Sequence, residues 1–457
     1  MSDVEEIVNN TLETQFNDFD KETVYHAKNE IIDVIGCLIA GARAPGCSQL
    51  VETVKSWGGR KDASILVHGG RVLAQNAALV NSVMARSFDY EVMQPCVDGI
   101  NFPAHINATT VPTAIAMAES RGAGCKELIT ALILGNDLAS RLIAAGDYSA
   151  ASPWDCTGTV TAFGAAAIAS RLFRLNKQQA RNAFGIVFSQ LGGTFQNLDD
   201  GTHSFKLPQG LASRAGIFSA ELAANGFLGV EDPFLSEKGY FPVYSGKCSP
   251  GVLTKQLGKK FYSEGVFKPY PSCRAVHSSI DCSLELVSKH DINPGDVQEI
   301  ILNLPVPVSY SDMAKPFKIR RVPQIDAAFN FSYNIANVII RKNVKLEHFT
   351  EDNVRDSQVV ALAGKVRVIA ALAPEKKQGA AVTVKMKDGQ EWSASVNVPK
   401  GDTTYSPLSE KEIDEKFRSN VAFSKTITVQ AAERALTMLK KLDEVDNVSS
   451  IIELLIA

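Results

Sequence analysis

The sequence predicts a mainly α-helical protein, in which a large helical-bundle domain carries an inserted α+β lid domain. Two observations support this fold class. Apolar residues recur three and four positions apart through most of residues 4–261, which is the spacing of amphipathic helices. After Gly265 the pattern changes to short β-branched stretches that are typical of strands. A chain of 457 residues is also long enough for two domains.

The N-terminal region is expected to form the bundle. Ala27, Ile31, Ile35 and Leu38 fall on one face of a predicted helix. The later segments "ALILGNDLASRLIAAG" and "TAFGAAAIASRLF" carry small side chains that let helices approach closely, so we expect them at the centre of the bundle. Helical spacing returns near the C-terminus in "AAERALTMLKKL". The predicted domains are therefore residues 1–265 plus 401–457 for the helical domain and residues 266–400 for the lid.

The lid is expected to contain a sheet. Four segments read as strands: "VQEIILNLPV", "KVRVIA", "AAVTVKMKDG" and "QEWSASVNVP". Asp388-Gly389 is a hairpin signal between the last two. Two helical segments, residues 273–290 and 327–340, lie between the strands without a regular strand-helix alternation, and this favours an α+β unit.

Composition argues against several classes of protein. A net charge of −3 without any Lys/Arg run argues against nucleic acid as a partner. The acidic start "MSDVEEIVNN" lacks the features of a signal peptide, and the apolar segment 31–42 is too short to cross a bilayer, so we expect a cytoplasmic protein without a membrane partner. Eight cysteines without a C-x-x-C pair argue against a zinc or iron–sulfur site, and we expect no metal.

The densest group of reactive side chains lies in "KPYPSCRAVHSSID", residues 268–281. Two prolines hold its start extended, and Ser272 is expected to cap the helix that follows. Cys273, His277 and Asp281 are spaced four residues apart, so they would lie near one face of that helix.

Three hypotheses for this segment remain open at the level of sequence. The cysteine and histidine could form a nucleophile pair. The segment could be a capped helix start without a chemical role. Alternatively, Arg274 and the helix N-terminus could hold an anion while His277 acts as an acid or base.

Three further segments place isolated ionisable residues among apolar ones. "DGTHSFKLPQGLASRAG" carries Lys206 just before a Pro/Gly turn, where a cation can point into a cavity. "NFPAHINATTVPTA" carries His105, and "FDYE" carries Asp89. The alternatives are a solvated lysine and a structural histidine and aspartate.

These stretches resemble the 2-methylcitrate dehydratase family, also called MmgE/PrpD, which includes cis-aconitate decarboxylase and iminodisuccinate epimerase. "KPYPSCRAVHSSID" is similar to the family's Tyr-Pro-Ser-Cys-Arg-x-x-His segment, and "FKLPQGLASRAGIFSAELAANGF" is similar to its Lys-x-Leu-x-x-Gly-x-Ala segment. "MARSFDYE", "HINATTVP", "CTGTVTAFGAAA" and "AAFNFSYNIA" follow the family pattern more loosely. The resemblance covers nearly the whole chain.

The resemblance implies a set of site residues and a chemistry. The residues expected to be catalytic are His105, Lys206, His277 and Asp89. The residues expected to bind substrate are Arg274, Tyr333 and Asp155. The family handles short polycarboxylates without a metal or other cofactor and removes a proton beside a carboxylate, and cations stabilise the resulting enolate-like carbanion. A homodimer formed through the helical domain is also implied.

Two departures from the family pattern suggest different substrate contacts. The family's Asp-Phe-Asp-Asp-Thr segment corresponds to Asp89-Tyr90-Glu91-Val92-Met93, which lacks the threonine and one carboxylate. Asp155 stands where the family usually has a histidine, and an anion there disfavours a substrate carboxylate at that spot.

The leading functional hypothesis is a metal-free dehydratase, a carbon–oxygen lyase that acts on a small hydroxy di- or tricarboxylate. An epimerase of the iminodisuccinate type and a decarboxylase of the same family are the close alternatives. A non-catalytic carboxylate-binding protein is the hypothesis from a different class.

Overall fold

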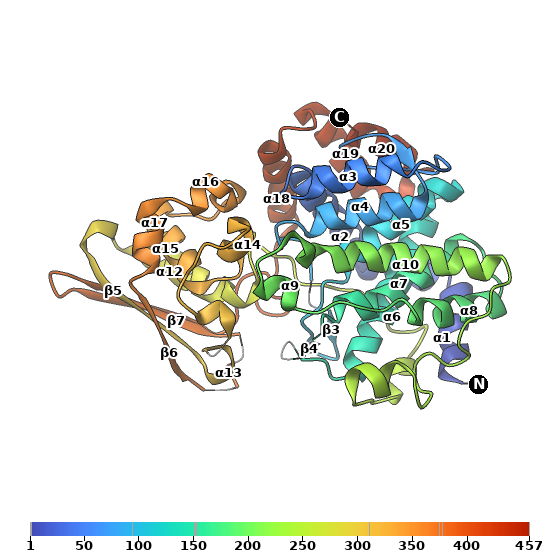
Figure 1. Ribbon diagram of the computed structural model, residues 1–457, viewed down its shortest axis with the longest axis horizontal. Coiled ribbons are helices and arrows are strands. Elements are labelled where there is room, and N and C mark those ends of the chain that lie inside the picture. The colour runs from blue at the N-terminus through green and yellow to red at the C-terminus, as the bar shows by residue number, and fades with distance from the viewer. Residues whose placement is uncertain are drawn as a thin grey trace.

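The protein is mainly α-helical, with a larger helical part and a smaller α+β part at its side (Figure 1). The computed structural model describes residues 2–93, 95–149, 152, 154–309, 311–373, 375–376 and 378–456. The predicted fold class is confirmed. The domain boundaries stay a prediction.

Long helices pack around a buried centre in the larger part. They are α1 (Asp3–Glu13), α2 (Lys21–Gly41), α3 (Cys47–Ser56), α4 (Ala74–Arg86), α5 (Asn107–Arg121), α6 (Cys125–Ala145), α7 (Thr157–Leu172), α8 (Lys177–Phe188) and α10 (Leu207–Ala224). Every residue of α7 is buried, and α7 packs on α6 and α10. A Cβ added to Gly135 of α6 would lie 2.8 Å from the carbonyl oxygen of Gly164 in α7, so small residues are required where these helices meet.

Short elements connect these helices. They are the hairpin strands β1 (Ala63–Ser64) and β2 (Arg71–Val72), the hairpin strands β3 (Cys96–Val97) and β4 (Ile100–Asn101), and the helices α9 (Gln196–Asp199) and α11 (Gly251–Thr254).

Among the described residues, α6 alone is long and apolar enough to cross a membrane, and 94% of its most apolar 18-residue stretch is buried inside the protein. That burial is typical of a core helix.

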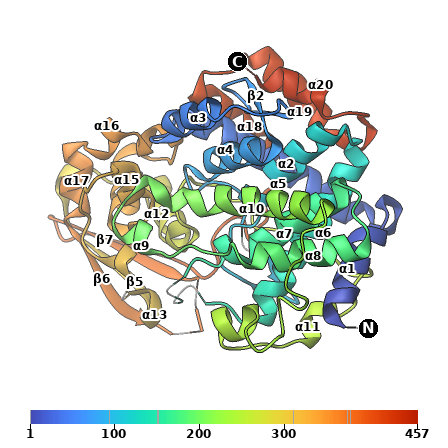
Figure 2. The same cartoon turned by 45° about the vertical axis from the view of Figure 1, so that its right-hand side comes forward.

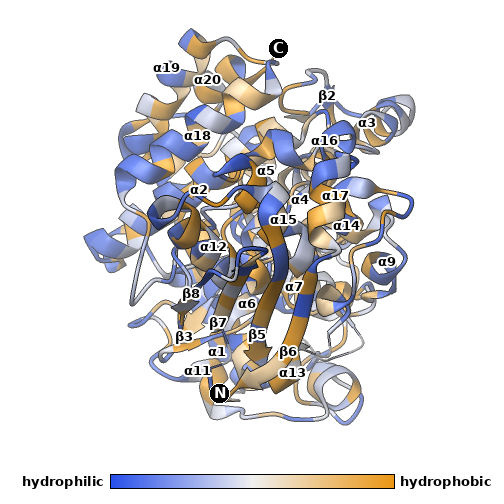
Figure 3. Ribbon diagram, turned by 90° about the vertical axis from the view of Figure 1, so that its left-hand side faces the viewer, coloured by the Kyte–Doolittle hydropathy of each residue, from blue (hydrophilic) through white to orange (hydrophobic). Residues whose placement is uncertain are grey.

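The smaller part contains a four-stranded sheet in the order β6-β5-β7-β8, which Figure 3 shows side by side. The strands are β5 (Val297–Pro305), β6 (Val366–Leu372), β7 (Ala380–Met386) and β8 (Glu391–Val396). β5 pairs in parallel with β6 and antiparallel with β7, and β7 and β8 form the predicted hairpin, in which Gly389 has a φ of 88°. Burial alternates along β7, and α12 (His277–Lys289) packs on β7 and β8. The core of this part therefore lies between α12 and the sheet.

The remaining helices of the smaller part are short. They are α13 (Val306–Ser309), α14 (Pro323–Ala328), α15 (Phe331–Arg341), α16 (Glu351–Val354) and α17 (Ser357–Ala363). The chain then returns to the larger part through α18 (Glu410–Ser424), α19 (Val429–Lys440) and α20 (Ser449–Ile452). α18 and α19 pack on α2, and Figure 2 shows these C-terminal helices beside α2 to α4.

The start of α12 differs from the prediction. Ser272 does not cap this helix, because a 3₁₀ turn over Arg274–Val276 precedes it and α12 begins at His277. The Ser272 hydroxyl is buried and has no hydrogen-bond partner among the described residues. The capping prediction was therefore wrong: the chain tightens into a 3₁₀ turn before the α-helix can start.

Candidate active site

The loop after α4 holds the carboxylates of Asp89 and Glu91 in a fixed position. Asp89 has a left-handed backbone with a φ of 51°, a conformation that Asp tolerates better than most residues. Behind the loop, Asp33 of α2 accepts a hydrogen bond of 2.7 Å from the Val92 amide. Lys416 of α18 donates to the Tyr90 carbonyl at 2.7 Å and forms an ion pair of 2.6 Å with Asp33. Buried polar contacts from both ends of the chain therefore fix this loop.

The same loop pairs with the segment that leads into α12. Met93 and Val266 exchange two backbone hydrogen bonds, of 3.1 and 2.6 Å. This pairing places the fully buried Lys268 against the loop, where its Nζ donates to the carbonyl of Asp89 at 2.7 Å and to Oδ1 at 2.8 Å. Lys268 is thus held by two oxygens of one residue.

Asp89 and Glu91 form a buried charge cluster with Arg86. Arg86 Nη1 donates to Asp89 Oδ1 and lies 3.6 Å from Glu91 Oε1. Burial by itself raises the pKa of both carboxyls, but Arg86 is the strongest of the opposing charges and holds each pKa below its ordinary value. Both carboxyl groups are therefore ionised at neutral pH.

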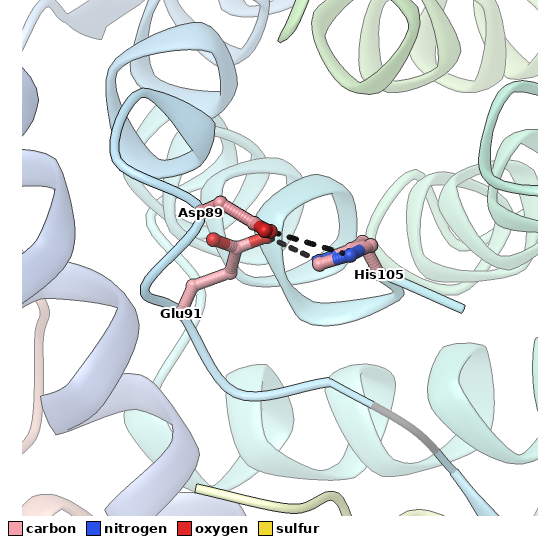
Figure 4. A group of neighbouring side chains, drawn as sticks. All are labelled: Asp89, Glu91 and His105. Atoms are coloured by element: carbon pink, nitrogen blue, oxygen red, sulfur yellow. Dashed lines mark hydrogen bonds and ion pairs between the residues drawn. The ribbon is translucent and has the colours of Figure 1, made fainter. Parts of the chain in front are cut away.

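The carboxylates of Asp89 and Glu91 point toward His105 from the same side (Figure 4). Its Nδ1 is 2.7 Å from Glu91 Oε1, and its Nε2 is 3.5 Å from Asp89 Oδ1. Burial, followed by the charge of Arg86, lowers the pKa of His105, so the ring is neutral at pH 7. An ionised carboxylate only accepts, so the short contact assigns the proton to Nδ1 and leaves the Nε2 lone pair available as a base.

Two oxygens of this cluster lack a hydrogen-bond donor in the described part of the chain. Asp89 Oδ2 and Glu91 Oε2 are buried and unpartnered among the described residues. A buried carboxylate oxygen without a donor is costly in free energy. A substrate hydroxyl could supply the missing donor, so the cluster has the features of a binding site.

The cluster could also be considered as a metal site. Asp89, Glu91 and His105 offer three ligand atoms that lie within 4.8 Å of one another. However, Asp89 Oδ1 already contacts both Arg86 and Lys268. A divalent ion would be placed beside two buried cations, which repel it strongly in a medium of low dielectric constant. The residues present therefore fit a metal poorly.

Dialysis of the protein against EDTA is expected to leave its turnover unchanged, because Arg86 and Lys268 already balance the carboxylates that would ligate a metal. Turnover should be measured before and after dialysis, and after addition of Mg²⁺, Mn²⁺ or Zn²⁺. Activity that is lost on dialysis and restored by one of these ions would contradict the expectation.

Lys206 lies at the start of α10 and contacts the same loop from another side. Its Nζ donates to the Pro45 carbonyl at 2.8 Å, to Ser87 Oγ at 3.0 Å and to Cys47 Sγ at 3.3 Å. Burial lowers the pKa of this ammonium group. Among the described residues, no carboxylate lies within ion-pair distance of Lys206, so its positive charge is uncompensated beside the Asp89 loop.

His277 and Arg274 form a second buried pair. Arg274 Nη1 donates to His277 Nδ1 at 3.3 Å, and His277 Nε2 donates to the Ser272 carbonyl at 3.2 Å. Burial and then the charge of Arg274 lower the pKa of His277 well below its ordinary value. His277 is therefore neutral, with its proton on Nε2. The charges of Lys268 and Asp89 also act on the pKa of His277.

The guanidinium group of Arg274 donates mainly to backbone carbonyl oxygens. It donates to the carbonyl of Lys400 and, at 2.9 Å, to that of Pro399, and only its Nε has no partner among the described residues. Burial raises the pKa of the neighbouring Cys273 to about 11, so its thiol is protonated at neutral pH. This argues against the nucleophile hypothesis. A substrate contact by Arg274 stays a prediction.

The other two expected substrate ligands lie in different surroundings. Asp155 Oδ1 accepts from the Thr157 amide at 2.9 Å at the start of α7, and its charge also acts on Arg86. Tyr333 points elsewhere: its hydroxyl donates to the His348 carbonyl, and its ring packs against Phe317. The structure does not bring Tyr333 into the cluster.

Three members of the cluster were not singled out from the sequence. They are Arg86, Glu91 and Lys268. Each stands near a residue that was chosen, because Arg86 and Glu91 flank Asp89 and Lys268 opens the segment of His277. Their closeness in sequence to Asp89 and His277 was the available signal. The directions in which their side chains point could be learned only from the fold.

The fold and this cluster define a class of two-part, mainly α-helical proteins that gather carboxylates, histidines and cations in one buried group. The chain belongs to the MmgE/PrpD family. The model of the MmgE/PrpD N-terminal domain matches residues 5–252, and that of the C-terminal domain matches residues 270–444.

Three relatives match along nearly their whole length. The cis-aconitate decarboxylase-like protein oryM of Aspergillus oryzae (strain ATCC 42149 / RIB 40) is 22% identical over 98% of this chain and 96% of its own. The cis-aconitate decarboxylase of Aspergillus terreus is 22% identical over 96% of this chain and 93% of its own. That of Aspergillus terreus strain NIH 2624 / FGSC A1156 is 21% identical over the same shares.

Proposed function

We propose that the protein is an enzyme that acts on a small polycarboxylate, and that it is a metal-free dehydratase for a hydroxy di- or tricarboxylate. The observation that carries this proposal is the neutral His105, whose Nδ1 lies 2.7 Å from the buried carboxylate of Glu91. A histidine held in this tautomer is suited to removing a proton. Family membership supports the class of substrate.

The charge balance of the buried groups supports an anionic substrate. Arg86, Lys206, Lys268 and Arg274 supply four cations. The carboxylates of Asp89, Glu91 and Asp155 act on Arg86, and those of Asp281 and Asp402 act on Arg274. Asp89 and Glu91 mainly offset Arg86 and Lys268, whereas Lys206 has no carboxylate partner among the described residues. A carboxylate of the substrate would give Lys206 the anionic partner that it lacks among the described residues.

In the proposed reaction, His105 Nε2 takes the proton from the carbon next to a substrate carboxylate. The electron pair of that C–H bond moves into the carboxylate, and the enolate-like charge is stabilised by the buried cations. The charge then returns to form the carbon–carbon double bond while the neighbouring C–O bond breaks. The leaving hydroxide takes up a proton from solvent and departs as water, and His105 returns the proton that it removed to solvent.

Decarboxylation is the second candidate, because the relatives named above are cis-aconitate decarboxylases or resemble them. That reaction begins with cleavage of a C–C bond and needs an acid to protonate the product carbon. A neutral histidine with a free lone pair favours a reaction that begins with proton removal, so we place dehydration first.

Proton NMR in deuterated water tests the proposal. The protein is incubated with citrate, 2-methylcitrate and cis-aconitate, and the products are followed with time. Dehydration of a hydroxy acid gives alkene signals, either a vinyl proton or an allylic methyl group, without loss of carbon, which is the expected result. Carbon dioxide release would support the second candidate, and deuterium exchange with retained hydroxyl would show an epimerase. Binding without any of these changes would contradict an enzymatic role.

Glu91→Gln is expected to lower turnover by about 10²-fold, at the lower end of what acid–base catalysis contributes. The variant loses the anion that orients His105. Because the charge of Glu91 raises the pKa of His105, its loss should lower that pKa further. Activity requires neutral His105 and is lost as pH falls through this pKa, so the acidic limb of the turnover profile should move to lower pH.

The measurement is turnover against pH for the wild type and Glu91→Gln. Glu433→Gln is the matched control, since Glu433 pairs with Arg418 at the surface. The control profile should be that of the wild type. A Glu91→Gln profile with unchanged height and position would show that Glu91 does not act through His105.

A further inference from the structure

A separate cavity of about 400 Å³ lies where the two parts of the molecule meet. Its wall is formed by the end of α2, residues 43–45, residues 321–324 at the start of α14, and residues 423–425 at the end of α18. Figure 1 shows α14 and α18 at this junction. Asp89, Glu91, His105, Lys268 and His277 are not among its lining residues. The cavity is therefore distinct from the candidate active site.

Three cationic side chains line this cavity. Arg43, Arg321 and Lys425 line it and are exposed. In the part of the chain that the structure describes, none of these three side chains makes an ion pair or a hydrogen bond. The acidic residue on the wall, Glu351, is paired with Arg355 at 3.0 Å. The cavity therefore has a net positive charge, which favours an anion.

Apolar side chains form a further part of the wall, beside the polar residues His203, Gln324, Thr350 and Ser424. Phe88 and Phe423 meet edge to face with their ring centroids 5.4 Å apart. Phe349 and Val322 add further buried apolar surface. An occupant that fills the cavity should therefore combine an apolar group with its negative charge.

We propose that this cavity binds a small organic phosphate monoester that carries an aromatic group. Three cations from separate segments can converge on one dianionic group, and the two guanidinium groups suit the oxygens of a phosphate. The aromatic group would lie against Phe88 and Phe423. A phosphate concentrates about two charges on one group, whereas a polycarboxylate spreads its charges over several.

The occupant would lie close to the Asp89 loop. Gln324 of the cavity wall donates to the Ser87 carbonyl at 2.6 Å. Lys206 donates to the carbonyl of Pro45, another wall residue, at 2.8 Å and to Ser87 Oγ at 3.0 Å. A bound ligand would contact Arg321 of the smaller part and Arg43 and Lys425 of the larger part. It would therefore connect the two parts beside the residues that hold Lys206.

Calorimetric titration of the full-length protein at about 0.15 M salt tests the proposal. The probes are phenyl phosphate, adenosine monophosphate, inorganic phosphate and citrate. Phenyl phosphate or adenosine monophosphate should bind more tightly than inorganic phosphate, because only the esters fill the apolar wall. The double variant Arg43→Gln/Arg321→Gln should weaken that binding at least about tenfold.

Two further variants distinguish binding in the cavity from general attraction to surface charge and from binding at the Asp89 cluster. Lys177→Gln/Lys247→Gln removes the same charge from the surface, where each lysine is paired with a carboxylate, and should bind the esters like the wild type. His105→Gln changes the Asp89 cluster and should also bind them normally. The proposal is overturned if neither ester binds, if the arginine variant binds as the wild type does, or if His105→Gln abolishes binding.

Discussion

Replacement of His105 by glutamine is expected to lower turnover by about 10²–10⁴-fold while the protein stays folded. His105 is the neutral histidine whose Nε2 is left without a proton by the contact of Nδ1 with Glu91. Glutamine keeps an amide that can donate to Glu91, so the buried carboxylate retains a partner, but an amide cannot accept a proton at neutral pH. The loss should therefore appear in turnover more than in the melting temperature.

The measurement is turnover on whichever polycarboxylate the NMR experiment identifies, together with thermal unfolding. His68→Gln is the matched control, because the His68 ring bonds the Ala42 carbonyl at 2.9 Å and takes no part in the cluster. The control should retain turnover within about threefold of the wild type. A well-folded His105→Gln with wild-type turnover would remove His105 from the mechanism.

Asp89→Asn is expected to reduce the free energy of unfolding by about 3–5 kcal/mol, which is the usual effect of breaking a buried ion pair. Asp89 is 1% exposed and supplies the carboxylate that Lys268 and Arg86 share. Asparagine tolerates the left-handed backbone of this position, so the change isolates the charge. The measurement is denaturant unfolding at several pH values.

The pH dependence of this difference has a definite sign. The pKa of Asp89 is lowered in the folded protein, so its charge contributes stability above the ordinary pKa of an unfolded aspartate, about 4. That contribution is lost as pH falls below this value toward the folded pKa. The difference between wild type and Asp89→Asn should therefore be constant near neutral pH and shrink only in acid.

Asp98→Asn is a closely matched control. Asp98 also has a left-handed backbone, with a φ of 49°, and also contacts two lysines. Its side chain is 36% exposed, so water replaces most of what the substitution removes. We expect a change of less than about 1 kcal/mol. If Asp89→Asn changes stability no more than Asp98→Asn does, the buried cluster contributes little to the fold.

The fold could be predicted from local patterns because each signal was carried by neighbouring residues. Alternation and the Asp388-Gly389 turn specify the hairpin of β7 and β8, and small residues specify the contact of α6 with α7. The start of α12 was predicted wrongly, because a serine at a helix boundary does not reveal whether a 3₁₀ turn intervenes. Helix type at a boundary depends on packing that no local pattern records.

The candidate site was predictable only in part. Asp89 and His105 stood out among apolar residues, and the structure brings them together. It does not bring Tyr333 to them, because the direction of a side chain on a buried helix depends on its tertiary neighbours. Lys268 was missed because the direction of its side chain also depends on its tertiary neighbours. The catalytic roles, the homodimer and the cytoplasmic location stay predictions.

The contacts behind the Asp89 loop also set an order of events during synthesis. Asp33, the segment around Val266 and Lys416 all hold this loop, and Lys416 is separated from Tyr90 by 326 positions in the sequence. Synthesis runs from the N-terminus, so Asp33 and the Asp89 loop leave the ribosome before α18 does. Until then Asp33 lacks its buried ammonium partner. A chain that lacks α18 therefore cannot complete the contacts of this loop.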